Sequence, residues 1–114
     1  MKINADEIYS KIIGAAEGAF EDGWDAVKTY APAEFKKMSV QLAEIVENVA
    51  LYEMDKTKGY SPETGKILFK MQKAACESVL VAVTHLTLTA VQKAINAILK
   101  TLKDVFGGVI ATIV

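Results

Sequence analysis

One histidine and one cysteine are the residues of this sequence best suited to acid–base, nucleophilic or metal chemistry. No second histidine, cysteine or carboxylate stands at a metal-ligand spacing from His85 on the same helical face, so we expect a core or interface histidine with satisfied polar atoms. Cys76 lies nine residues earlier, about half a turn out of phase, which rules out a pair with His85 within one helix but leaves open a pair between subunits. We expect Cys76 to be a small buried hydrophobe.

Acidic residues form the second group that suggests chemistry. Glu17, Glu21 and Asp25 share one helical face, and Glu44 and Glu47 form a smaller pair, so either set has the oxygen ligands for a cation. The Glu-x-x-His element of di-iron helical bundles is absent. We therefore interpret both sets as solvated acidic surface.

Motifs for catalysis are missing from the chain. It has no glycine-rich phosphate loop, no nucleophile elbow and no zinc-spaced set of cysteines and histidines. The aromatic residues that could sandwich a planar ligand are scattered: they are Tyr9, Trp24, Tyr30 and Tyr60. We predict a protein that is not an enzyme, with no catalytic residues, no cofactor and no metal.

The elements that position these residues are predicted to be few, long helices. The 114 residues suffice for a single domain, 1–114, and only two prolines and seven glycines interrupt it. Asn4 and Glu7 match a capping-box pattern, and Pro32 suits the first turn of a second helix. The predicted fold is all-α and begins with a helical hairpin of about 4–30 and 32–55, with a weak point at Asp22–Gly23.

The second hairpin helix and the third helix differ in pattern. A three-four spacing of apolar residues marks the seam of the second: it runs through Phe35, Met38, Leu42, Ile45, Val49 and Tyr52. Ser61 and Pro62 start one long helix of about 62–106 that Gly107 and Gly108 end. Its middle is uncharged from 78 to 92, which predicts burial nearly all round.

The length of that third helix raises a packing problem. At 1.5 Å per residue it would be about 66 Å long, whereas a compact domain of this size has a radius of gyration near 13 Å. The helix either breaks near 84–89, which would give a four-helix bundle, or stays straight and is covered by other copies. The THLTLT stretch favours a break through its poor helix propensity, but it contains no Gly or Pro. We therefore expect the straight helix and an oligomer.

Self-association would then use the apolar stripe of the long helix and the apolar C-terminal tail, 106–114, as a clasp. The predicted oligomer interface consists of Val79, Leu86, Val91, Ile95, Ile98, Leu102, Val105, Val109 and Ile113.

The charge layout bears on partners and location. Residues 1–55 hold eleven acids and five lysines, a net of −6, and residues 56–114 hold three acids and eight lysines, a net of +5. Complementary charge suggests that the halves lie against each other, within one chain or between two. The absence of arginine argues against nucleic-acid binding. The start, MKINADEIYS, has no apolar signal region, and the longest uncharged run is short of a membrane span, so we expect a cytoplasmic protein.

The sequence therefore favours a non-enzymatic interaction or scaffold protein that self-associates through its C-terminal helix. The first alternative is a membrane-surface protein that exposes residues 79–114 to lipid, with Lys93, Lys100 and Lys103 near anionic head groups. The second is a carrier of an apolar ligand between helices.

Overall fold

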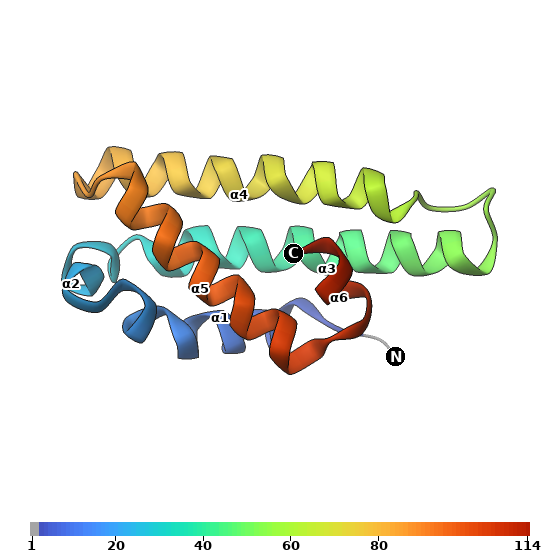
Figure 1. Cartoon of the computed structure of the whole chain (residues 1–114), viewed down its shortest axis with the longest axis horizontal. Helices are drawn as coiled ribbons and strands as arrows, with labels where there is room; N and C mark the ends of the chain where they lie inside the picture. The colour runs from blue at the N-terminus through green and yellow to red at the C-terminus, as the bar shows by residue number, and fades with distance from the viewer. Residues whose placement is uncertain (1–2) are drawn as a thin grey trace.

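The computed structural model describes residues 3–114 and is all-α, as the sequence predicts (Figure 1). The elements are α1 (Ala5–Phe20), the 3-10 turn η1 (Glu21–Gly23), α2 (Trp24–Val27), α3 (Ala31–Met54), α4 (Pro62–Thr84), α5 (Leu88–Phe106) and α6 (Gly108–Ile113). They form a bundle of 45 × 22 × 19 Å with a radius of gyration of 14.1 Å.

The first hairpin begins and bends where the sequence predicts. The Asn4 side chain accepts a hydrogen bond from the Glu7 backbone N–H at 2.9 Å and donates one to the Glu7 carboxylate at 3.0 Å, which is a reciprocal cap. Helix α1 ends at Phe20, and the chain turns through η1 and α2 before α3. The predicted first helix of about 4–30 is therefore interrupted at the Asp22–Gly23 weak point.

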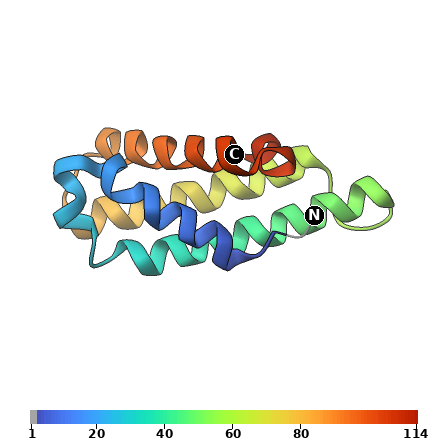
Figure 2. The ribbon, with the colours of Figure 1, turned by 90° about the horizontal axis from the view of Figure 1, so that it is seen from below.

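The predicted seam of α3 lies in the core. Phe35, Met38, Leu42 and Val49 are fully buried, whereas Tyr52 at the end of the seam is only partly buried. Ser61 then caps α4 by accepting a hydrogen bond from the Thr64 N–H at 3.2 Å. Because α3 and α4 are longer than their neighbours, the end of their hairpin projects beyond α1 and α5 (Figures 1 and 2).

The preferred prediction of one straight helix over about 62–106 is wrong, and the alternative break near 84–89 is confirmed. Helix α4 ends at Thr84, and His85 adopts the left-handed conformation with φ 63° and ψ 12°. Thr87 then caps α5 by accepting a hydrogen bond from the Ala90 N–H at 3.1 Å. No Gly or Pro makes this break; the Leu86 side chain in the turn packs against Gly23 of η1, at the same end of the bundle (Figure 1).

The turn allows the chain to cover its own apolar length. Helix α5 packs along α1, α3 packs along both α1 and α4, and α4 also contacts α5, so four helices enclose one core (Figure 2). After Gly107, whose φ is 57°, the apolar tail forms α6 and packs on α3, α4 and α5. The tail therefore closes the core of its own chain. None of the helices in the described range 3–114 has the length and apolar character needed to cross a membrane.

Candidate functional site

The structure separates the two residues singled out for chemistry. His85 is exposed in the turn between α4 and α5, so it is not a core histidine of its own chain, and its placement at an interface stays a prediction. Cys76 is fully buried on α4, as predicted. Burial, together with the nearby carboxylates of Glu34 and Glu77, raises the pKa of the Cys76 thiol to about 12. A thiol held in its neutral form is a poor nucleophile.

The acidic residues singled out from the sequence remain on the surface, and Glu17, Glu21 and Asp25 do not converge. Glu17 lies on α1, Glu21 begins η1 and Asp25 lies on α2, so the bend at Phe20 ends their shared face. Asp25 pairs with Lys28 at 3.2 Å. Within residues 3–114, no three histidine, cysteine or carboxylate side chains are grouped so as to hold a metal ion.

The predicted oligomer interface is largely inside the bundle. Five of its nine residues are at most 5% exposed: Val91, Ile95, Ile98, Leu102 and Ile113. The turn at His85 buries the first four by laying α5 on α1, and Ile113 is buried because α6 packs on α3, α4 and α5. Leu86 and Val109 are partly buried against the same core. Only Val79 and Val105 are exposed, at 37% and 51%. The reasoning that a straight helix leaves these residues uncovered is therefore wrong, because the chain itself covers seven of them.

A different apolar surface is left exposed, on the outer side of α4. Its nine residues are all solvent-exposed and uncharged, and we call them the α4 face: Ile67, Leu68, Met71, Ala74, Ala75, Ser78, Val79, Ala82 and Val83. Ile67 and Met71 are the most exposed of its large apolar side chains, at 61% and 64%. At 100° per residue, the five charged residues of α4 fall within an arc of about 80° on another side of the helix.

The α4 face continues into a hollow beside α3. This hollow has a volume of about 370 Å³ and is lined by Gln41, Ile45, Tyr60, Leu68, Met71 and Gln72. Two of these residues, Leu68 and Met71, belong to the α4 face itself. The hollow is also free of charged side chains, so the apolar surface of α4 extends without a charge toward α3.

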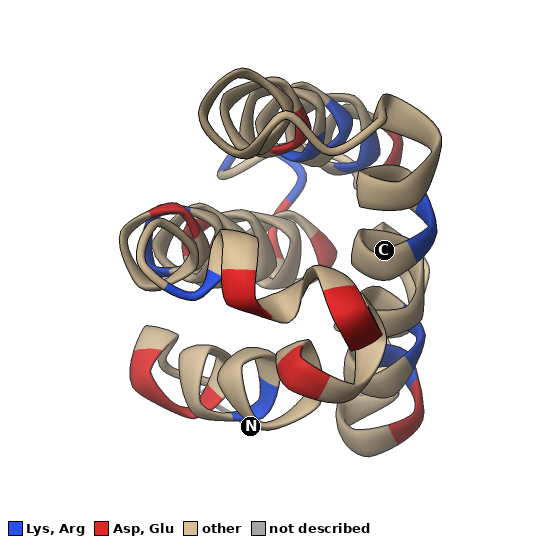
Figure 3. Cartoon of the chain, turned by 90° about the vertical axis from the view of Figure 1, so that its left-hand side faces the viewer, with Lys and Arg blue, Asp and Glu red and all other residues tan. Residues whose placement is uncertain are grey.

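Charged groups are gathered elsewhere on the molecule. Acidic side chains predominate on α1, η1, α2 and α3, and lysines lie on α4 and α5 (Figure 3). The two oppositely charged halves do lie against each other within the chain, as predicted, because α1 packs along α5 and α3 packs along α4. Ion pairs between described residues do not join them. Among residues 3–114, each ion pair joins two residues of the same half, including Lys36–Asp6 at 2.9 Å and Lys73–Glu77 at 2.8 Å.

A second hollow, of about 590 Å³, lies where α3 extends past the start of α1. Val40, Leu51 and Met54 line it together with Glu44 and Glu47. Its lining is mostly apolar but includes these two carboxylates, so it is not uncharged as the α4 face is.

Comparison with known proteins does not link this site to an established one: no family model matches the chain, and neither the curated proteins nor the solved structures include a match.

Proposed function

We propose that this protein is a non-enzymatic interaction module that self-associates through the α4 face, forming an antiparallel pair of bundles. The proposal keeps the function favoured by the sequence and moves the surface from α5 to α4. The observation that carries it is the combination of wide exposure and missing charge on the α4 face. Monomeric proteins rarely leave a contiguous apolar patch of this kind without a partner.

The spacing on the α4 face fits another helix. Leu68, Met71, Ala75, Ser78 and Ala82 follow one another by three, four, three and four residues, which is the repeat of helices that pack side by side. The core of the same chain uses a separate stripe of α4 that includes Phe69, Cys76 and Leu80. Helix α4 therefore carries two packing stripes, of which the bundle uses one.

A second copy of the chain fits this surface because the face is self-complementary. Large side chains stand in its first half and small ones in its second half. A two-fold axis near Ala75 places Leu68 of one copy opposite Ala82 of the other, and Met71 opposite Ser78. Such an arrangement packs the small side chains of each helix against the large side chains of its partner. Because the α4 face contains no charged residue, its burial would remove no charged group from water.

The expected affinity is modest. The exposed parts of Ile67, Leu68, Met71, Val79 and Val83 amount to somewhat more than two whole side chains per copy. Burying them in both copies contributes roughly 7 to 14 kcal/mol. Association costs about 4 to 15 kcal/mol. We therefore expect a reversible dimer with a Kd between about micromolar and millimolar.

Sedimentation velocity from about 10 µM to 1 mM tests the proposal. The wild-type chain should shift from monomer to dimer over this range, and Met71→Lys should weaken dimerisation at least about tenfold because it places a charge in the interface. Met54→Lys is the matched control, since Met54 is 85% exposed but lies at the end of α3, outside the α4 face. Val105→Lys tests the surface predicted from sequence and should have no effect.

A wild-type chain that remains monomeric at the highest concentration would refute the proposal. Equal dimerisation of Met71→Lys and Met54→Lys would refute the choice of surface. Since Met71 is exposed, circular dichroism is expected to show that Met71→Lys folds normally.

The membrane-surface alternative has less support. Most of the apolar residues that α5 and α6 contribute to this region lie in the core, so lipid contact through them would require these helices to leave the bundle. The cytoplasm stays the expected location, because a reducing compartment suits a chain whose one cysteine is buried as a thiol.

A further inference from the structure

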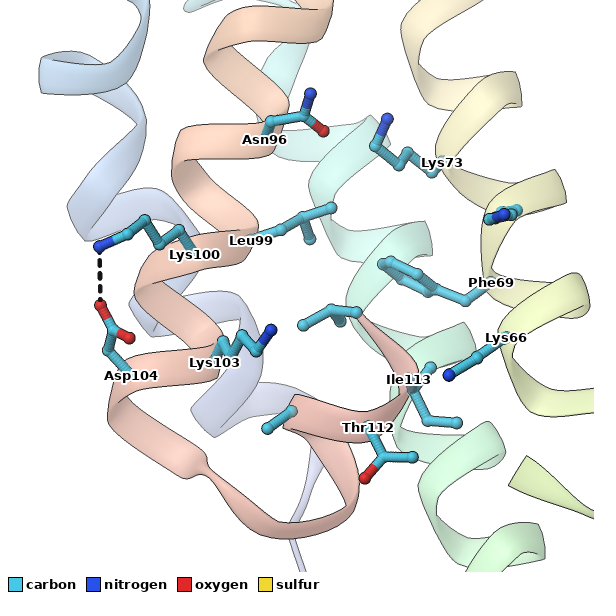
Figure 4. A pocket seen from close by; sticks show the side chains of 13 residues that line it. Lys66, Phe69, Lys73, Asn96, Leu99, Lys100, Lys103, Asp104, Thr112 and Ile113 are labelled. Carbon is cyan, nitrogen blue, oxygen red and sulfur yellow. Dashed lines mark hydrogen bonds and ion pairs between the residues drawn. The ribbon is translucent and has the colours of Figure 1, made fainter. Parts of the chain in front are cut away.

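A cleft of about 920 Å³ opens between α4, α5 and α6 (Figure 4). It exists because α4 and α5 diverge from the turn at His85, while α6 crosses the wide end of the gap (Figure 1). Phe69 from α4 and Leu99 from α5 form its floor together with Ile113 from α6. These three side chains are at most 5% exposed, so the floor is held in place by the core.

Lysines from two helices line the cleft. Helix α4 contributes Lys66, Lys70 and Lys73, and α5 contributes Lys100 and Lys103. Asp104 is the one acidic side chain in the lining. The turn at His85 brings together two lysine groups that are about thirty residues apart in the sequence.

Two of the five ammonium groups are neutralised by neighbours on their own helix. Lys73 pairs with Glu77 at 2.8 Å, and Lys100 pairs with Asp104 at 3.4 Å. Lys66, Lys70 and Lys103 have no carboxylate within ion-pair distance among residues 3–114. Among the side chains of the cleft, three lysines are therefore left without a carboxylate partner in the described part of the chain.

The side chains also differ in direction. Lys66 and Lys103 extend into the space between the helices, whereas Lys100 turns away toward Asp104 (Figure 4). Asn96 and Thr112 add neutral polar groups to the wall. The cleft thus presents unpaired ammonium groups beside groups that can donate hydrogen bonds to an oxyanion.

We propose that this cleft binds a small anion that bears phosphate groups and at least two negative charges. Ammonium groups that share one cleft repel each other, and an anion between them removes that repulsion. Lysine binds phosphate as a point charge, which does not require the planar fork of arginine. The buried floor offers little apolar area, so charge rather than hydrophobic contact provides the recognition. The phosphate could be carried by a soluble molecule or by a lipid head group.

Isothermal titration with inorganic triphosphate at low ionic strength tests the proposal, using the whole chain. We expect saturable binding of one anion per chain, weakened by added salt. The double variant Lys66→Gln/Lys103→Gln should bind about tenfold more weakly, because it removes two charges that face the anion. Both residues are exposed, and glutamine keeps the helix propensity of lysine, so the fold is expected to be retained.

The matched control is Lys11→Gln/Lys58→Gln, which changes the net charge equally with lysines that do not line the cleft. It should change the affinity less than about twofold. A second arm uses vesicles of phosphatidylcholine with or without a phosphoinositide. Binding of triphosphate identifies a soluble ligand. Binding of phosphoinositide vesicles without binding of triphosphate identifies a lipid head group. In either case the cleft variant must lose the binding.

Absence of saturable binding in both arms would overturn the proposal. So would equal weakening in the cleft variant and the control variant, because general attraction of an anion to the charged C-terminal half would then explain the result.

Discussion

Gly65 on α4 offers a sharp test of how closely the helices pack. It is buried, and a Cβ atom built on it would lie 2.8 Å from Ile113 Cδ1, 3.0 Å from Ile45 Cγ2 and 3.1 Å from Val49 Cγ2. The Ile113 methyl is the end of a flexible side chain and can move. The other two are branch methyls of stiff side chains on α3, so they give way less readily.

Gly65→Ala therefore sets two effects against each other. Replacing a glycine inside a helix with alanine stabilises the fold by about 0.5 to 1 kcal/mol when there is space. Overfilling a packed core costs about 1 to 3 kcal/mol. The steric cost should win, so we expect Gly65→Ala to be neutral or to destabilise by up to about 2 kcal/mol.

Gly14→Ala is the matched control for this prediction. Gly14 lies inside α1, and a Cβ atom there would meet nothing within 4 Å. We expect this variant to be more stable than the wild type by about 0.5 to 1 kcal/mol, which would raise the Tm by a few degrees. Thermal and urea unfolding, followed by circular dichroism at low protein concentration, measure both variants. If Gly65→Ala proves as stabilising as Gly14→Ala, the close approach of α4 to α3 and α6 is wrong.

Two further predictions concern the α3–α4 connection and the buried thiol. Gly59→Ala should destabilise the fold by about 2 kcal/mol or more in urea unfolding, because Gly59 has a φ of 58° and a Cβ atom would overlap the Asn48 carbonyl oxygen; an unchanged midpoint would contradict this turn geometry. The Cys76 thiol, with its pKa raised to about 12 by burial, should favour folding fully below the ordinary pKa near 9 and lose that contribution as the pH rises from 9 toward 12. Wild-type stability should therefore fall more steeply over this range than that of Cys76→Ala, and a thiol reagent should react with the native protein far more slowly than with the unfolded chain. Parallel pH profiles or rapid labelling of the native state would count against a buried neutral thiol.

Much of the fold follows from local signals in the sequence. The reciprocal cap at Asn4, the Ser61–Pro62 start of α4 and the Gly107 stop act through neighbouring backbone groups, so the residue types identify them. The α3 seam is recognisable because its apolar residues keep one spacing over nearly the whole helix. Each of these features depends on residues a few positions apart.

The turn at His85 depends instead on distant contacts. A left-handed conformation costs a histidine about 1 to 2 kcal/mol. The THLTLT segment contains no Gly or Pro, so it gives little reason to expect such a turn. The burial of α5 against α1 and the contact of Leu86 with Gly23 offset that cost. The absence of Gly and Pro therefore favoured the straight helix, and tertiary packing decided against it.

The α4 face was missed for a related reason. An uncharged stretch of helix indicates apolar surroundings but does not distinguish the protein core from an exposed surface that awaits a partner. The available signal was a second three-four stripe through Leu68, Met71 and Ala75, next to the buried stripe through Phe69 and Cys76. For the basic cleft, the sequence indicated only the positive net charge of residues 56–114, because its lysines come together only after the turn at His85 forms.

Whether the chain turns back at His85 decides which apolar surface is free to associate, and a distance between α4 and α5 measures this directly. Spin labels at Lys70 and Lys100, both exposed and both lining the basic cleft, can be placed in a Cys76→Ala background and diluted with unlabelled protein. The folded-back bundle predicts a separation of roughly 15 to 25 Å, allowing for the cleft and the label side chains. A straight helix would separate the two positions by about 45 Å, and that result would contradict the bundle and return the apolar stripe of α5 to the surface.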